Sequence, residues 1–276
     1  MQSPLMPPAD LIEQPQREVS DSAPRFCSRC GSPRDAAELE CSHCASGAVT
    51  TESQLKEQFR LDIGSLRSSL FLYFALLGVS AAAMIWYKAA GRLPSAMSEF
   101  VTSAAFSVPV VAWCLFALKP ILQLLKARFH AGWLLAAVSL SLATYLLATG
   151  AVNLLVWLGV EKLEYLSVLS DDGFGFGWAV LLICVQPAIF EELAFRGIIQ
   201  GSLERFLGAR EALIVSALMF GILHLSILSL PHLLVMGLVL GWLRLKTGSL
   251  LPGMALHFSH NFLVIVDEQV GGFWLW

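Results

Sequence analysis

The stretch GFGWAVLLICVQPAIFEELAFRGIIQ, residues 175–200, is apolar over most of its length and carries charge only near its end. A helix that spans a bilayer needs roughly 20 mostly apolar residues, so this stretch is long enough to cross. Six other apolar runs have a comparable character, at about 69–87, 102–124, 131–159, 211–229, 231–246 and 248–266. The sequence therefore predicts an all-α fold, a polytopic bundle of about seven transmembrane helices.

The composition of the whole chain agrees with a membrane protein. Of its 276 residues, 56% are hydrophobic and 14% are charged, whereas about a quarter of the residues of a soluble domain are charged. Residues 1–68 hold 17 of the 39 charged side chains, so the charge is concentrated in a polar head. The composition excludes a uniformly soluble enzyme and a disordered or fibrous chain, and it predicts membrane lipid as a partner. The net charge of −3 gives no indication of a nucleic-acid partner.

Four of the six cysteines lie in this head as two CxxC pairs, Cys27 with Cys30 and Cys41 with Cys44. Each pair can close a knuckle around one tetrahedral ion, and two knuckles supply the four thiolates of a structural zinc site. The alternative is two disulfides or a pair of redox thiols. It is disfavoured because no signal peptide precedes the cysteines and disulfides need an oxidising compartment. The spacing predicts a zinc ribbon over residues 25–46, a module that often binds a protein partner.

The segments around the ribbon, and the loops beyond it, predict how the chain is oriented. Residues 1–24 are rich in proline and acidic residues and indicate a disordered arm, and residues 47–68 indicate a juxtamembrane linker. Lys and Arg are enriched in cytoplasmic loops. With the head inside, eight of them beyond residue 68 fall on the inner side and three on the outer side: Lys119, Lys126, Arg128, Arg196, Arg205, Arg210, Arg244 and Lys246 against Lys88, Arg92 and Lys162. The sequence thus predicts an integral protein of the inner or plasma membrane with a cytoplasmic N-terminus.

Ionisable residues inside an apolar span are costly and indicate function. In FEELAFRG, residues 190–197, Glu192 and Arg196 are spaced i,i+4 and can form an ion pair on one face. Glu191 lies about 100° around the helix axis from Glu192, so it does not take part in this ion pair. A carboxylate beside such a pair suits a general acid or base. The alternative is a helix end that emerges into water with its charges solvated.

Two later segments carry further polar residues at membrane depth. His224 ends the run FGILH near the middle of its predicted helix, and His257 and Asn261 share one face of another. His260 points about 60° from His257, either into the same site or into a neighbouring interface. His232 follows Pro231 at a helix start and is interpreted as structural. A lone His in such a position could also be satisfied by a backbone carbonyl or a Ser.

These side chains permit two kinds of chemistry. Glu191 and His224 can activate water, while His257 and Asn261 can donate hydrogen bonds to a developing oxyanion. The same His and Glu residues can instead hold a divalent metal that activates the water. Composition and spacing leave both open, so an active-site metal is not decided.

The three motifs EELAFRG, FGILH and GLVLGWLRLKTGSLLPGMALHFSHN closely resemble those of the CPBP family, the type II CAAX prenyl endopeptidases and bacteriocin-processing or immunity proteins also called Abi. The family pattern is EExxxR, FxxxH and HxxxN/B on separate helices, and all three match. The resemblance covers roughly residues 130–266. It predicts a protease domain over 130–276, preceded by accessory transmembrane helices over 69–129.

The resemblance also implies roles for the matched residues. Glu191 and His224 would activate the water, and Glu192 and Arg196 would form a structural ion pair or a substrate clamp. His257 and Asn261 would form the oxyanion hole. The family has been described both as metalloproteases and as metal-free glutamate proteases, and a carboxylate mechanism is favoured here.

The predicted function is hydrolysis of peptide bonds in membrane-anchored proteins or peptides, CAAX-type processing included. The alternative is a non-catalytic membrane immunity or scaffold protein that docks partners through its zinc ribbon. A third reading, a small proton-relaying transporter, would require internal repeats with broken helices, and no convincing repeat is found.

Overall fold

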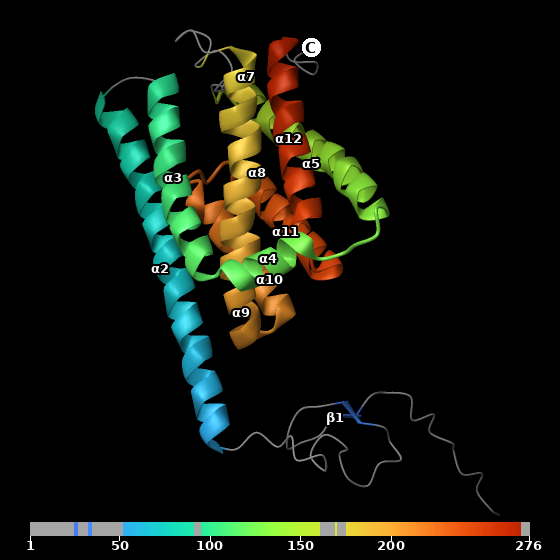
Figure 1. Ribbon diagram of the computed structural model, residues 1–276. Helices are drawn as coiled ribbons and strands as arrows, with labels where there is room; N and C mark the ends of the chain where they lie inside the picture. Colours follow the sequence, from blue (N-terminus) through green and yellow to red (C-terminus); the bar gives the residue numbers. More distant parts are fainter. Residues whose placement is uncertain are drawn as a thin grey trace, which may run out of the picture. The chain divides into compact units, whose positions relative to one another are not determined.

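The computed structural model describes residues 25–26, 33–34, 52–90, 95–160, 169 and 175–271 (Figure 1). The chain divides into two compact units, Met1–Gln58 and Phe59–Trp276. The described helices confirm the predicted all-α class: α2 (Glu52–Ala90), α3 (Ala96–Phe116), α4 (Leu118–Lys126), α5 (Gly132–Trp157), α7 (Phe176–Ala179), η1 (Val180–Val185), α8 (Gln186–Glu191), η2 (Glu192–Ile199), α9 (Gln200–Leu207), α10 (Ala209–Leu223), α11 (Leu230–Thr247) and α12 (Leu251–Gln269). The elements η1 and η2 are π-helical.

The first unit contains two short strands in its described part. β1 (Arg25–Phe26) pairs antiparallel with β2 (Pro33–Arg34), with Arg25 opposite Arg34. In sequence these strands flank the first CxxC pair. The arm 1–24 and the four predicted zinc ligands lie outside the described residues, so the ribbon stays a prediction. Residues 52–68, expected as linker, form the first part of α2.

Four helical segments are long and apolar enough to cross a membrane: Phe59–Ala89, Ala96–Phe116, Gly132–Trp157 and Phe176–Leu207. The remaining apolar runs form α10, α11 and α12. The run expected at 211–229 is helical only as far as Leu223, so His224 caps the end of α10 and does not lie near the middle of a helix. The count of seven spans stays a prediction.

The second apolar run, expected at 102–124, differs from the prediction because it breaks in two. α3 ends at Phe116, and α4 begins after Ala117. Pro120 explains the break, since a proline ring clashes with the carbonyl four residues earlier and removes a backbone donor. In the first turn of a new helix that donor is not needed. α4 runs across the long helices rather than along them (Figure 1).

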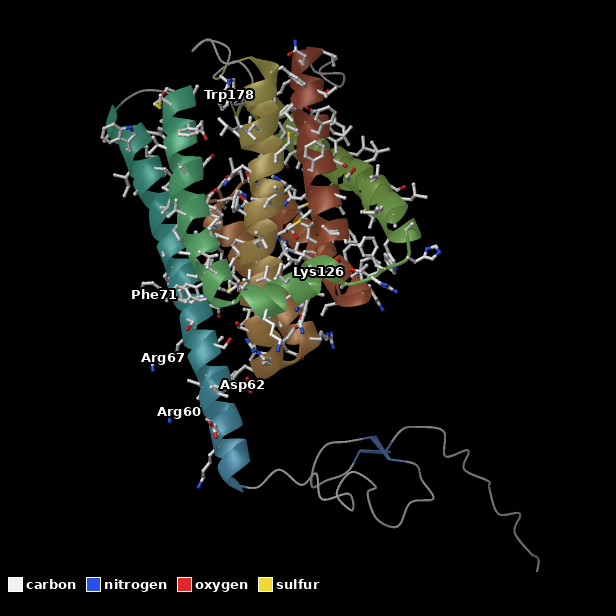
Figure 2. All side chains as sticks on the ribbon, in the orientation of Figure 1. Arg60, Asp62, Arg67, Phe71, Lys126 and Trp178 are labelled. Carbon is white, nitrogen blue, oxygen red and sulfur yellow. The ribbon has the colours of Figure 1, made fainter. Side chains whose placement is uncertain are left out.

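The helices α2 and α3 present apolar side chains outward. Phe71, Phe74, Trp86 and Val108 are all more than half exposed. Only 17% of the apolar window of α3 is buried, against 39% in Phe176–Leu207. Such unpartnered apolar surface suits contact with lipid. Figure 2 shows Arg60, Asp62 and Arg67 toward one end of α2 and Trp178 toward the opposite end of the bundle.

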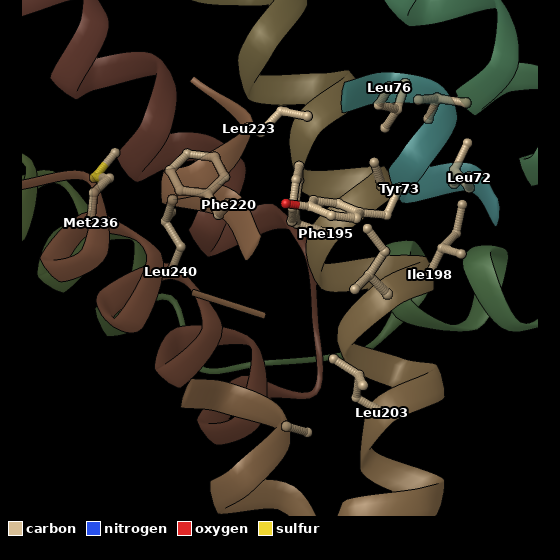
Figure 3. Packing of buried hydrophobic residues seen from close by; sticks show 14 of the residues in the cluster. Leu72, Tyr73, Leu76, Phe195, Ile198, Leu203, Phe220, Leu223, Met236 and Leu240 are labelled. Carbon is tan, nitrogen blue, oxygen red and sulfur yellow. The ribbon is translucent and has the colours of Figure 1, made fainter. Parts of the chain in front are cut away.

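A row of aromatic rings forms the centre of the core. Tyr73 of α2 packs edge-to-face on Phe195 of η2, with ring centroids 6.4 Å apart. Phe195 packs in the same way on Phe220 of α10 at 5.2 Å (Figure 3). The adjacent contact of α10 with α11 is tight, because a Cβ on Gly237 would lie 2.9 Å from Cα of Ala217. This row ends at Phe220, whose ring contacts His224 and His257, two of the polar side chains singled out from the motifs.

Candidate active site

The helix that carries the two glutamates is interrupted by two π-helical segments, η1 and η2, on either side of α8. Such segments are rare and often occur at functional sites. Pro187 lies at the start of α8 and has no N–H to offer to the carbonyl of Ile183. The amide Nδ2 of Asn261 on α12 donates to that carbonyl instead, at 2.7 Å. Asn261 therefore joins α12 to the irregular helix just before the glutamates.

Glu192 and Arg196 form a fully buried ion pair. Nη1 of Arg196 donates to Oε1 of Glu192 at 3.0 Å, and the side chains are 2% and 1% exposed respectively. Nη2 of Arg196 donates to the carbonyl oxygen of Gly237 at 3.2 Å. The guanidinium lies over the ring of Phe220, 4.5 Å from its centroid. Charge, hydrogen bonds and ring together compensate for burying the cation.

His257 of α12 lies between the two carboxylates. Its Nδ1 is 3.1 Å from Oε1 of Glu192, and its Nε2 is 3.8 Å from Oε2 of Glu191. A carboxylate oxygen accepts, so Nδ1 is the donor to Glu192. Gly253, one helical turn before His257, makes room for this arrangement because a Cβ there would lie 3.0 Å from Oε2 of Glu192.

Glu191 is placed differently from its neighbour. Its side chain is 15% exposed, and its buried Oε2 has no hydrogen-bond partner among the described residues. The 3.8 Å gap to Nε2 of His257 is too long for a direct hydrogen bond. A carboxylate oxygen held this way can accept a proton from a small molecule bound beside it.

His224 follows α10 as its C-terminal cap. Its Nδ1–H donates to the carbonyl oxygen of Phe220 at 2.9 Å, so in the neutral ring Nε2 is the free acceptor. Within the described residues no hydrogen bond joins His224 to Glu191. The ring of Phe220 lies between the histidines, 5.0 Å from His224 and 6.1 Å from His257. In the structure Glu191 lies nearer to His257, and the role expected for Glu191 and His224 in activating water stays a prediction.

Comparison with known proteins places this geometry in a family. Residues 173–263 match the model of a family described as type II CAAX prenyl endopeptidase Rce1-like. This segment of the chain belongs to the Rce1-like family. No curated protein and no solved structure matches the chain significantly. The Rce1-like segment holds all the candidate catalytic side chains, while α2 to α5 lie outside it. With the four apolar helices, it identifies an integral membrane protein.

Two more histidines of the Rce1-like segment approach the site. Nδ1 of His260 lies 3.0 Å from Oγ1 of Thr144 on α5, so His260 contributes to the interface between α5 and α12. His232 of α11, interpreted from sequence as structural, lies within electrostatic range of both His224 and His260. The position of His232 could not be predicted from the motifs, because this residue belongs to none of the three.

A small apolar cavity lies between helices of the Rce1-like segment. Its volume is about 320 Å³. Its lining comes from η1 and α8 on one side and α12 on the other: Val185, Ala188, Ile189, Met254, Ala255, Phe258 and Ser259. These are the helices that carry Glu191 and His257.

The described residues of the Rce1-like segment do not form a metal centre. No group of three His, Cys, Asp or Glu side chains among them is arranged to hold an ion. Whether the active site uses a metal, left open by the sequence, therefore stays undecided, and no step below is derived through one.

Proposed function

We propose that the chain is an intramembrane endopeptidase that hydrolyses peptide bonds of membrane-associated proteins or peptides, CAAX-type processing included, with Glu191 activating the attacking water. The observation that carries this proposal is the buried, unpartnered Oε2 of Glu191, 3.8 Å from Nε2 of His257. The match to a family of type II CAAX prenyl endopeptidases supports the reaction class.

The two adjacent glutamates would divide the work. Glu192 is occupied by Arg196 and by Nδ1 of His257, so it orients these groups. Glu191 has no such partner and can gain and lose a proton. Pairs of carboxylates in different environments are a common basis for acid and base roles.

In the proposed reaction Glu191 takes a proton from water, and the oxygen forms a bond to the scissile carbonyl carbon. His257, through Nε2 when both ring nitrogens carry protons, and Asn261, through the Nδ2 hydrogen that the carbonyl of Ile183 does not use, would donate hydrogen bonds to the resulting oxyanion, as the family resemblance implies. The carbon–nitrogen bond then breaks, and the proton on Glu191 passes to the leaving amine. His224, with Nε2 free to accept, would serve as an additional proton carrier.

The apolar cavity between α8 and α12 supports a lipid-like or apolar segment in the substrate. It is lined mainly by aliphatic side chains and Phe258. A substrate held there by hydrophobic burial would place its backbone near Glu191, because the cavity and the carboxylate share the same two helices.

The N-terminal unit belongs to the same proposal. The four cysteines would hold one structural zinc ion, and the ribbon would bind a protein partner in the cytoplasm. The spacing of Cys27, Cys30, Cys41 and Cys44 supports this role. The membrane topology would comprise seven spans in an inner or plasma membrane with the N-terminus inside, as the distribution of Lys and Arg indicates.

The proposal is tested by comparing peptide termini in membrane proteins from cells that express the native chain or Glu191→Gln. Glu211→Gln is the matched control, because Glu211 is an exposed carboxylate at the start of α10. We expect new termini with the native chain and with the control, and none with Glu191→Gln. Identical termini in all three, with equal amounts of protein in the membrane, would favour the scaffold alternative.

A further inference from the structure

A second cavity, of about 630 Å³, lies away from the glutamates, between α2, the α3–α4 bend and the stretch η2–α9. Its lining contains both polar and apolar side chains. Arg205 and Arg244 contribute cations, and Ser65, Ser68 and Ser202 contribute hydroxyl groups. No Asp or Glu is among the described residues that line it.

The rest of the cavity lining is mainly apolar and aromatic. It is formed mainly by the end of α3 and by α4, with one residue of η2: Trp113, Phe116, Pro120, Ile121, Leu124 and Ile198. Two glycines, Gly197 and Gly201, form part of its floor. A Cβ on Gly201 would lie 3.4 Å from Nη2 of Arg244, so glycine leaves the space beside that guanidinium open.

The arginines are held in place while keeping donor capacity. Arg244 pairs with Glu204, yet its Nε is buried and has no hydrogen-bond partner among the described residues. Arg205 donates to the hydroxyl of Ser65, which also lies 3.0 Å from the hydroxyl of Ser202. A guanidinium presents five N–H groups in a fixed plane that suits phosphate oxygens.

The location of the cavity indicates where its ligand comes from. Arg205 lies two residues from the end of the apolar segment Phe176–Leu207. α4, which carries Lys119 and Lys126, crosses the bundle at this level (Figures 1 and 2). Lipid phosphates occupy this interfacial zone, and basic pockets between transmembrane helices bind anionic head groups.

We propose that this cavity binds an anionic phospholipid, with the phosphate at Arg205 and Arg244 and an acyl chain along Trp113, Phe116 and Ile121. No carboxylate is among the described lining residues, and Glu204 beside the cavity is already paired with Arg244, so the ammonium of a zwitterionic headgroup would lack a free counter-charge. The aromatic and aliphatic wall gives the chain an apolar contact that a free anion would not use. This site is independent of the proposed peptidase activity.

The test is native mass spectrometry of the purified full chain, titrated with phosphatidylglycerol, with phosphatidylcholine or with inorganic phosphate. Phosphatidylglycerol should bind at least tenfold more tightly than phosphatidylcholine. Arg205→Gln should weaken its binding at least fivefold, since one of two phosphate contacts is lost. Arg210→Gln, which removes an exposed arginine outside the cavity, should leave binding unchanged.

A second variant keeps the charges and fills the space. Ser68→Phe should weaken phosphatidylglycerol binding without changing the arginines. The proposal is overturned if Arg205→Gln and Ser68→Phe bind phosphatidylglycerol like the native chain, or if phosphatidylcholine binds equally well. Displacement of the lipid by millimolar inorganic phosphate would assign the site to a free anion instead.

Discussion

Two polar clusters lie on consecutive stretches of one helix and contact α11 in the same way. In the site cluster, formed by Glu192, Arg196 and His257, Arg196 donates to the carbonyl of Gly237 at 3.2 Å. In the end cluster, formed by Gln200, Glu204 and Arg244, Gln200 donates to the carbonyl of Gly241 at 3.3 Å. Each cluster contains one Arg–Glu ion pair.

The clusters differ in burial and in what stands beside them. The ion-pair side chains are 2% and 1% exposed in the site cluster but 13% and 21% exposed in the end cluster. In the end cluster, water can hydrogen-bond to a group that loses its partner. In the site cluster water has no access, so each buried charge needs its partner side chain. Among the described residues, a second carboxylate, Glu191, lies beside the ion pair of the site cluster, next to His257. The fully buried ion pair, Glu192 with Arg196, therefore lies next to Glu191, the residue proposed to activate water.

Arg196→Met should produce the largest change in stability. It leaves Glu192 buried without its cation, which costs about 3–5 kcal/mol. The thermal midpoint of the purified protein, followed by circular dichroism, should fall by roughly 10 °C. The double variant Glu192→Leu with Arg196→Met should recover much of this loss, since it strands no charge. If Arg196→Met alone were as stable as the native chain, the description of the site cluster would be contradicted.

Gly237→Ala should have an intermediate effect. The new Cβ would lie 2.9 Å from Cα of Ala217, so α10 and α11 would have to move apart. Overpacking of this kind costs about 1–3 kcal/mol. Gly241→Ala is the matched comparison, because there the closest atoms are the side-chain ends of Leu213 and Gln200, which can shift. The thermal midpoint of Gly237→Ala should be lower than that of Gly241→Ala. The reverse order would show that α10 and α11 pack less tightly than described.

Arg244→Met should have the smallest effect. Its partner Glu204 is 21% exposed and also accepts from Nε2 of Gln200 at 3.1 Å, so it stays solvated after the loss. We expect a cost of about 1 kcal/mol, as for other accessible ion pairs. A loss as large as that of Arg196→Met, measured in the same unfolding assay, would abolish the distinction between the clusters.

The helical architecture could be predicted because apolar length alone specifies helix in a membrane. Each run found in the sequence contains a described helix, although the run at 211–229 is helical only as far as Leu223. The break at Ala117 was missed, although Pro120 signals it, because the run 102–124 stays apolar across the break. The π-helical segments could not be predicted, since they depend on contacts such as that between Asn261 and the carbonyl of Ile183.

The site was predicted best where residues are close in sequence. The i,i+4 spacing of Glu192 and Arg196 indicated their ion pair, which the structure contains. The position of His257 between both carboxylates was missed, because motif order does not report distances between helices. The approach of His232 was missed for the same reason. The catalytic roles themselves stay predictions.

The central claim is that Glu191 performs chemistry while its neighbours hold the site together. The most direct measurement follows product formation and thermal midpoint for the purified native chain and for Glu191→Gln, with a substrate identified from the termini comparison. The account predicts that Glu191→Gln unfolds within about 2 °C of the native chain while product formation falls at least about 100-fold. A variant with native stability that forms product at the native rate would contradict it.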